Sequence, residues 1–140
     1  MVTIITGIDI QSFDEVEESI ARFGGRYLRR IYSEREVVEC MAHLPTMARC
    51  LAVRFAAKEA VLKALTPHDH IPSWRTIEVL FHSKSSPTVE LCGEAELLAR
   101  RRGVEKMFLS VSLGRGCAVA AVVADVTSSG VASDSRAEPR

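Results

Sequence analysis

Two carboxylates stand at positions where the surrounding sequence is apolar or helical. Asp9 interrupts an apolar run at residues 7–10, GIDI, and Glu59 lies within an alanine-rich helical pattern. A carboxylate in an apolar strand is costly to bury unless it is paired or bound to a metal ion, and an exposed strand edge is the other place that tolerates it. Magnesium takes oxygen ligands, usually one or two carboxylates with phosphates and water. Asp9 and Glu59 would hold such an ion if the strand and the helix pack side by side.

Basic side chains follow the same helical pattern. At about 100° per residue, Lys58 falls within an apolar stripe and Arg54 lies at its edge. The stripe consists of Leu51, Phe55, Leu62 and Leu65. A lysine among leucines must reach past them to water, form an ion pair or bind an anion. Lys63 lies four residues after Glu59, where the two form either a surface ion pair or a metal ligand beside a phosphate ligand. The candidate phosphate ligands are therefore Arg54, Lys58 and Lys63.

The elements that must position these residues follow from periodicity, capping patterns and glycine or proline breaks. The pattern predicts a strand at residues 3–10 and a helix from the cap Ser12 to residue 23, with Glu15 as capping-box partner. A second box, Ser33 with Glu36, opens a short helix towards residue 42, and a long helix spans residues 47–65. The remaining predicted elements are strands at 76–81 and 88–91, a helix at 93–102, and a hairpin of residues 106–113 with 117–126.

This order of elements predicts one small α+β domain over residues 1–126, with a mixed or antiparallel sheet and a long helix. Residues 127–140 are small and polar, and we expect them to form a disordered tail. The run His68-Asp69-His70 offers metal-binding side chains, but the favoured interpretation is a solvated loop, because no further ligand is near in the sequence.

Composition narrows the class of protein. The chain has 140 residues, of which 47% are hydrophobic, and its 18 basic and 18 acidic residues give no net charge. This balance argues against a protein that coats nucleic acid, and no apolar run approaches the roughly 20 residues that span a bilayer. No CxxC pair occurs, so we expect no zinc site, a cytoplasmic location and four free thiols. These thiols belong to Cys40, Cys50, Cys92 and Cys117.

Three segments, in this order, resemble the holo-acyl-carrier-protein synthases, the short 4′-phosphopantetheinyl transferases. They are residues 7–10, GIDI; residues 29–36, RRIYSERE; and residues 54–65, RFAAKEAVLKAL, which is similar to the family's long and specific signature. The resemblance covers nearly the whole chain except the tail. It implies transfer of 4′-phosphopantetheine from coenzyme A to a serine of an acyl carrier protein, with release of 3′,5′-ADP. It also implies a magnesium-dependent homotrimer with active sites between subunits.

The resemblance also implies roles for particular residues. Asp9 and Glu59 correspond to the family's magnesium ligands, and Lys63 completes the catalytic set. Ser86 and Pro87 are similar to the family's turn near the adenine of coenzyme A. A carboxylate-held water, or Glu59 itself, would take the serine proton. The family's cations near the coenzyme A phosphates correspond to Arg54, Lys58 and Lys63.

Several positions depart from the family's pattern. Leu113 stands where the family usually has a histidine near coenzyme A, and Glu15 stands where it has an arginine that meets the carrier protein. Thr66 and Pro67 replace a glycine-containing turn whose N–H groups approach phosphate, and proline has no N–H. The usual glycine and lysine before the turn proline are replaced by Ser85 and Ser86.

The departures leave three hypotheses open. The first is a transferase adapted to an unusual carrier protein, and the second is a homologue with weak or absent catalysis that binds coenzyme A or a carrier. The third is an interaction module in which the signature charges form only a salt network between subunits. Magnesium-dependent binding of coenzyme A separates them, because the transferase requires it and a purely structural trimer would lack it.

Overall fold

The computed structural model describes residues 2–42, 46–82 and 86–127. Its main sheet has the strand order β1-β5-β4, with both neighbouring pairs antiparallel. The strands are β1 (Val2–Ser12), β4 (Val104–Leu113) and β5 (Cys117–Thr127). The predicted terminal hairpin is confirmed. Thr127, the first residue of the expected tail, still belongs to β5, and residues 128–140 lie outside the described chain.

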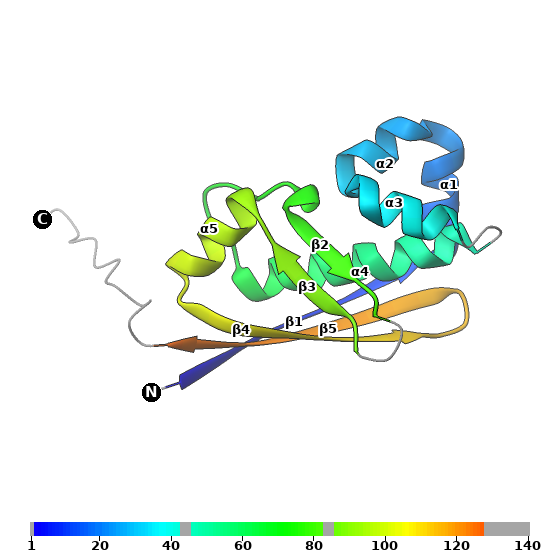
Figure 1. The fold of residues 1–140 in the computed structure, drawn as a ribbon. Coiled ribbons are helices and arrows are strands. Elements are labelled where there is room, and N and C mark those ends of the chain that lie inside the picture. The colour runs from blue at the N-terminus through cyan, green and yellow to red at the C-terminus, as the bar shows by residue number, and fades with distance from the viewer. Residues whose placement is uncertain (1, 43–45, 83–85, 128–140) are drawn as a thin grey trace, which may run out of the picture.

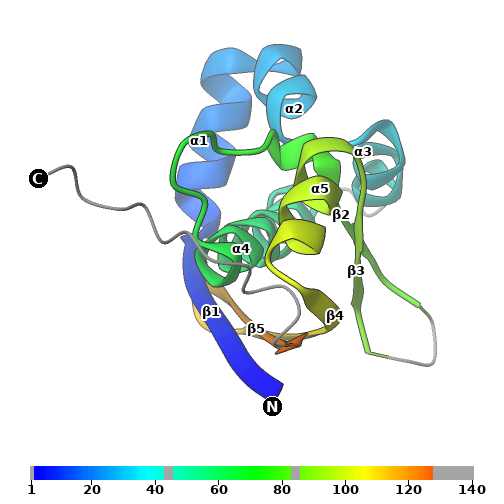
Figure 2. The same ribbon diagram turned by 90° about the vertical axis from the view of Figure 1, so that its left-hand side faces the viewer.

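The long helix α4 (Met47–Leu65) lies across one face of this sheet (Figures 1 and 2). The sequence predicted one apolar stripe, but the helix is buried on most of its circumference, because the sheet, the short helices and a second sheet all pack on it. Alanines make this close packing possible on both sides. Ala52, Ala56 and Ala60 of α4 and Ala118 and Ala120 of β5 are all fully buried.

Three short helices cover one end of α4, namely α1 (Phe13–Phe23), α2 (Gly25–Ile31) and α3 (Glu34–Met41) (Figure 1). The Ser12 side chain accepts a hydrogen bond from the Glu15 N–H at 3.3 Å, as expected for a helix cap. The predicted box of Ser33 and Glu36 is complete in both directions. Gly24, with φ of 53°, turns the chain between α1 and α2.

Cys40 and Cys50 form a disulfide, so the expectation of four free thiols is wrong. Cys40 lies near the end of α3 and Cys50 near the start of α4, and their Cα atoms are 5.5 Å apart. Sequence spacing alone did not indicate that the turn between the helices brings these positions together. Pro45, expected to punctuate this turn, lies outside the described residues. Cys92 and Cys117 are free thiols, and the disulfide removes the argument on which a cytoplasmic location rested.

A two-stranded antiparallel sheet, β2 (Ile77–Leu80) with β3 (Thr88–Leu91), packs on the other side of α4. The short 3-10 helix η1 (Trp74–Thr76) precedes β2, and α5 (Gly93–Arg101) follows β3. The predicted α+β class is confirmed. Within the described ranges, no helix has the length and apolar character needed to cross a membrane.

Candidate active site

Gly7 brings β1 into backbone contact with α4. A Cβ atom built on Gly7 would lie 1.9 Å from the carbonyl oxygen of Ala60 and 2.8 Å from the backbone nitrogen of Ala64. A larger residue therefore requires the strand or the helix to move. The contact sets the position of β1 along α4. Asp9 follows Gly7 by two residues and therefore lies on the same face of β1. Its side chain consequently lies beside the last turns of α4.

Asp9 forms an ion pair with Lys63 next to this contact. The Lys63 Nζ lies 2.8 Å from Asp9 Oδ1 and also donates to the carbonyl oxygen of Ile8 at 3.0 Å. Gln11 Nε2 donates to the other carboxylate oxygen, Oδ2, at 2.6 Å. The Asp9 side chain is 12% exposed and that of Lys63 is 54% exposed. The carboxylate is thus held on both oxygens, while the ammonium remains accessible to a ligand.

Glu59 lies one turn before Lys63 on α4 and lines a groove of about 420 Å³. Its carboxylate oxygen Oε1 accepts a hydrogen bond from Trp74 Nε1. The indole, which also lines the groove, therefore orients the carboxylate. The lining is completed by Leu62, Lys63, Thr66, Pro67 and Ile71.

The pair of carboxylates fits a magnesium ion that takes its remaining ligands from phosphate and water. In the described part of the chain, no group of three His, Cys, Asp or Glu side chains is arranged to hold a metal. Asp9 and Glu59 supply two hard oxygen donors near Lys63, which pairs with Asp9 and follows Glu59 by one helical turn. Magnesium is commonly bound through one or two carboxylates plus substrate phosphates.

Lys58 points into the core and away from the groove. Its Nζ is 2.8 Å from Glu36 Oε2, and both side chains are 0% exposed. The ammonium also donates to the carbonyl oxygens of Trp74, at 3.0 Å, and Ile77. Burial lowers the pKa of Lys58, and the neighbouring Glu36 opposes that shift. Of the possibilities for a lysine in the apolar stripe, the observed one is an ion pair.

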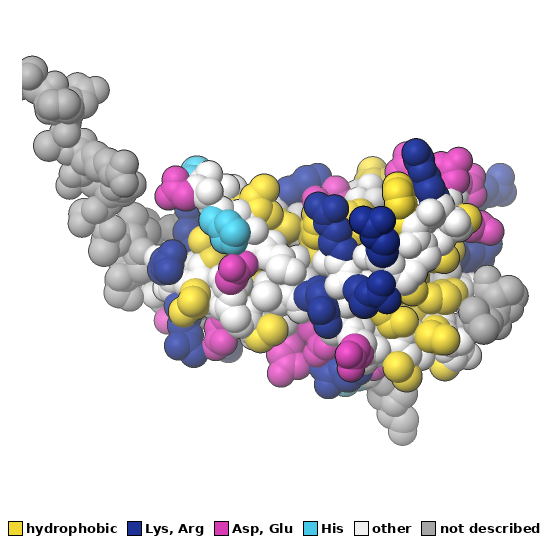
Figure 3. All heavy atoms as spheres, turned by 90° about the horizontal axis from the view of Figure 1, so that it is seen from above, with side chains coloured by type: hydrophobic (Ala, Val, Ile, Leu, Met, Phe, Trp, Pro, Cys, Tyr) yellow, Lys and Arg dark blue, Asp and Glu magenta, His cyan; other side chains and the backbone are white. Residues whose placement is uncertain are grey.

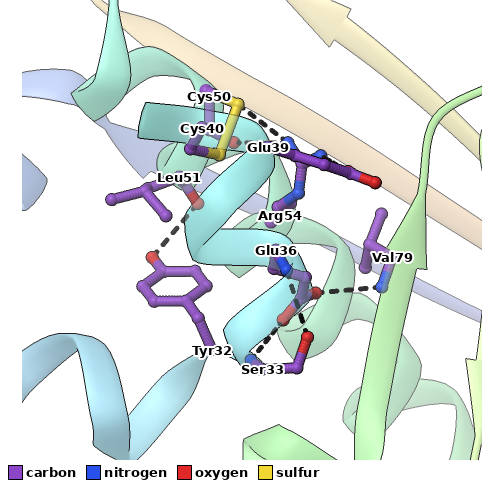
Figure 4. The surroundings of a disulfide bond; sticks show 9 residues. All are labelled: Tyr32, Ser33, Glu36, Glu39, Cys40, Cys50, Leu51, Arg54 and Val79. Carbon is purple, nitrogen blue, oxygen red and sulfur yellow. Dashed lines mark hydrogen bonds and ion pairs between the residues drawn. A yellow bond between two sulfur atoms is a disulfide. The ribbon is translucent and has the colours of Figure 1, made fainter. Parts of the chain in front are cut away.

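Arg54 lies at a second concave surface, next to the disulfide (Figure 4). Its Nη2 is 2.6 Å from Glu39 Oε2, and its Nη1 donates to Cys50 Sγ at 2.9 Å. The guanidinium also lies over the ring of Phe81, 4.7 Å from its centroid. The Arg54 side chain is only 4% exposed. The surrounding pocket of about 560 Å³ is lined by Glu39, Ala42, Cys50, Val53, Arg54, Phe81, Val111 and Leu113.

Ser86 and Pro87 lie just before β3, exposed and half-buried respectively. Neither lines the groove at Glu59 or the pocket at Arg54 of the same chain. Ser85 lies outside the described residues. Leu113, which stands at the position of the family histidine, does line the pocket at Arg54 and is 60% exposed.

Basic side chains gather over the end of the molecule that α1 and α2 occupy (Figure 3). Arg26 and Arg30 line a shallow groove of about 370 Å³ together with Phe23 and Trp74. The Arg30 guanidinium lies over the Trp74 ring, 5.9 Å from its centroid. The groove combines positive charge with aromatic surface, and through Trp74 it adjoins the groove at Glu59.

Three contributors to the site were missed by reasoning from the sequence. Gln11 holds Asp9, and its position two residues after Asp9 on the strand was a signal that was available. Trp74 holds Glu59, and Glu36 neutralises Lys58. Neither of these two had a sequence signal, because each lies at least 15 residues from its partner.

Comparisons with known proteins identify the family of the chain. A family model described as the 4′-phosphopantetheinyl transferase superfamily matches residues 5–122. The chain belongs to this superfamily. The match includes Asp9, Glu59 and Lys63.

The curated proteins to which the chain is similar include holo-[acyl-carrier-protein] synthases. It is 37% identical to that of Halothermothrix orenii over 120 residues, which cover 85% of this chain and 94% of the relative. It is 40% identical to that of Gloeobacter violaceus over 116 residues, 83% of this chain and 88% of the relative. The chain is also similar to the solved structure of the Helicobacter pylori holo-[acyl-carrier-protein] synthase in complex with coenzyme A. The TM-score is 0.72 at 30% identity, and the match covers 86% of this chain and 99% of that one.

Proposed function

We propose that this chain transfers the 4′-phosphopantetheine group of coenzyme A to a serine of an apo-acyl carrier protein and releases 3′,5′-ADP. The observation that carries the proposal is the meeting of Asp9 with Lys63 beside Glu59, within the region that matches the transferase superfamily. The serine oxygen bonds to the β-phosphorus of coenzyme A, and the bond from that phosphorus to the oxygen of 3′,5′-ADP breaks.

We assign Asp9 and Glu59 as the ligands of a magnesium ion, which when bound offsets the charge that builds on the phosphate oxygens. Gln11 and Trp74 orient these carboxylates before the substrate arrives. The exposed ammonium of Lys63 contacts phosphate oxygens as a point charge. The serine proton passes to Glu59 or to a water that Glu59 holds.

The pocket beside Arg54 supports a second part of the coenzyme A site. Phe81 and Leu113 provide an apolar surface suited to an aromatic base, and Arg54 provides a guanidinium for phosphate. Because Arg54 already pairs with Glu39, the phosphate would have to displace or join that pair. Ser86 and Pro87 stay in the proposal as the turn near adenine. Lys58 does not, because its ammonium is enclosed by protein oxygens.

We also propose that the enzyme is a homotrimer with active sites between subunits. The face of the main sheet that is turned away from α4 is rich in apolar side chains. They include Ile4, Ile8, Ile10, Phe108 and Val123, which are between 42% and 63% exposed. A contiguous apolar face of this kind is typical of a protein–protein interface. A location in the cytoplasm, with an acyl carrier protein as partner, completes the proposal.

The decisive experiment measures transfer by intact mass. The protein is incubated with coenzyme A, magnesium and a panel of apo-carriers, and each carrier is examined for the added phosphopantetheine. Asp9→Asn and Glu59→Gln should each lower turnover by at least about 100-fold without unfolding, because each removes one of two charged ligands from a weakly held ion. Chelation of magnesium should do the same to the wild type.

Three other results would contradict the proposal. Near-normal turnover in either variant would remove the metal assignment. Binding of coenzyme A without modification of any carrier would favour the hypothesis of a homologue without catalysis. A trimer that does not bind coenzyme A in the presence of magnesium would favour the interaction module.

A further inference from the structure

Residues 66–73 connect α4 to η1 and form one wall of the groove at Glu59. Thr66, Pro67 and Ile71 line the groove, and Trp74 follows immediately after the segment. We call residues 66–73 the strap. It leaves the C-terminal end of α4 and passes α5 on its way to η1 (Figures 1 and 2). The shape of the groove therefore depends on how the strap is held.

Thr66 begins the strap in a left-handed conformation. Its φ of 43° and ψ of 63° end α4, and its N–H donates to the carbonyl oxygen of Leu62 at 2.9 Å. Among the residues that the structure describes, Thr66 is the single non-glycine residue with positive φ. Glycine adopts the left-handed conformation readily, whereas a β-branched residue such as threonine strongly disfavours it. The surroundings must therefore hold Thr66 in place.

Arg102 supplies the contact that holds Thr66. Its Nη2 donates to Thr66 Oγ1 at 2.7 Å. Arg102 caps the C-terminus of α5, where its own N–H donates to the carbonyl oxygen of Leu98 at 3.0 Å. The helix is packed against the domain through Ala95 and Ala99, both buried. The donor is thus fixed on an element that is itself anchored.

The same helix holds the other end of the strap. Glu94 Oε2, in the first turn of α5, lies 3.2 Å from His70 Nε2 and accepts from the Ser73 N–H at 3.4 Å. Between these contacts a cavity of about 770 Å³ separates the strap from the helix, with His68 and Asp69 among its lining residues. Since the middle of the strap lies over a cavity, its position depends on contacts near its two ends.

We infer that α5 positions the strap against the transfer groove and that Arg102 is a positioning residue acting through Thr66. Arg102 stabilises at Thr66 the conformation that a glycine would adopt without assistance. It does not line the groove, so its influence on coenzyme A must pass through the strap. The kinetic consequence of this inference rests on the proposed function, whereas its structural consequence does not.

A double-mutant cycle tests the link between the two residues. Arg102→Ala should raise the KM for coenzyme A about 3- to 10-fold, the loss expected for one hydrogen bond. It should change kcat by less than about twofold, because it affects the strap that lines the groove and not the reacting groups. Thr66→Gly changes a residue that lines the groove, so its own KM is the reference for the second arm of the cycle. In the Thr66→Gly background, Arg102→Ala should change KM by less than about twofold.

Two further variants control for other effects. Arg102→Lys keeps a donor near Thr66 and should recover most of the wild-type KM. Arg101→Ala removes the same charge from the neighbouring position of α5, where the exposed side chain lines the same cavity, and should leave KM unchanged. An equal increase of KM from Arg102→Ala with threonine or glycine at position 66 would overturn the inference, as would an unchanged KM in Arg102→Ala itself.

Hydrogen exchange of the strap amides gives a readout that does not need activity. Arg102→Ala should speed the exchange of the Thr66 amide, because the left-handed turn is no longer held, and should not do so when position 66 is glycine. Exchange that is unaffected by Arg102→Ala would overturn the inference. If the wild type modifies no carrier, the proposed function fails, while exchange still decides whether Arg102 holds the strap.

Discussion

Lys58 and Glu36 carry opposite charges into the core, where neither side chain is exposed to water. Glu36 also accepts from the Ser33 N–H at 2.8 Å and the Val79 N–H at 2.9 Å, so one carboxylate joins α3, α4 and β2. A buried ion pair of this kind contributes little net stability compared with apolar residues, but removal of one partner leaves an unpaired buried charge. We therefore interpret Lys58 of the signature as a structural residue.

Lys58→Met should lower the free energy of unfolding by about 3 kcal/mol or more, because Glu36 is left buried without its counter-ion. Lys58→Met combined with Glu36→Gln should recover part of this loss. Urea denaturation followed by circular dichroism measures both. A Lys58→Met protein that is as stable as the wild type but no longer binds coenzyme A would contradict the structural role and restore the sequence-based hypothesis of a phosphate ligand.

At the level of elements, the disulfide joins the end of α3 to the start of α4, directly beside Arg54 (Figure 4). It closes a loop with a sequence separation of 10. A crosslink of this size restricts the unfolded chain and thereby stabilises the folded one. It also ties α3, which carries Glu36 and Glu39, to the helix that carries their basic partners.

Replacement of Cys40 and Cys50 by serine should lower the free energy of unfolding by roughly 2 to 3 kcal/mol, the entropy expected for a loop of this length. Thermal denaturation with and without a reducing agent checks this. Cys92→Ser is the control, because Cys92 is an exposed free thiol and its loss should change the melting temperature little. If the reducing agent leaves the melting temperature of the wild type unchanged, the disulfide does not stabilise the fold.

For the whole molecule, the main sheet has α4 on one face, and in the described chain nothing packs on the other (Figure 1). Ile8 on β1 and Phe108 on β4 are large apolar side chains, yet they are 60% and 61% exposed to solvent. A single chain gains nothing by presenting these side chains to water. The proposed trimer would cover this face and so account for these exposed side chains.

Ile8→Lys together with Phe108→Lys should convert the proposed trimer into a monomer, because three copies of each charge would be buried at the interface. Light scattering coupled to size exclusion measures the mass directly. Val38→Lys is the matched control, since Val38 is a 67% exposed apolar residue on α3 and away from the sheet. A wild type that is monomeric at micromolar concentration would refute the trimer.

Glu15→Arg should raise the specificity constant for an ordinary acidic carrier protein severalfold at low salt. Glu15 lies in the first turn of α1, one turn before Ser19, which lines the groove with Arg26 and Arg30. Its charge opposes an acidic partner. The advantage should shrink as salt screens the contact. Glu17→Arg makes the same change of charge about 200° further around the helix and should have a smaller effect. Equal effects of the two variants would place carrier docking elsewhere.

Local signals in the sequence were sufficient to predict most elements. Some elements depend only on neighbours a few residues apart, namely the caps at Ser12 and Ser33, the helix at residues 47–65 and the terminal hairpin. In the structure these elements lie close to their predicted bounds. The signature likewise identified the transferase family, because the identity and spacing of residues 54–65 are themselves local.

Only the tertiary structure decided which charged side chain meets which partner. Arg54, Lys58 and Lys63 were equivalent as candidates in the sequence, yet the first two pair with Glu39 and Glu36 of α3, whereas Lys63 pairs with Asp9 of β1. The disulfide and the strap contact of Arg102 also join distant residues. Periodicity places a side chain on a face of a helix, but the free energy of a charge depends on its burial and its counter-ion, and both are set by how the elements pack.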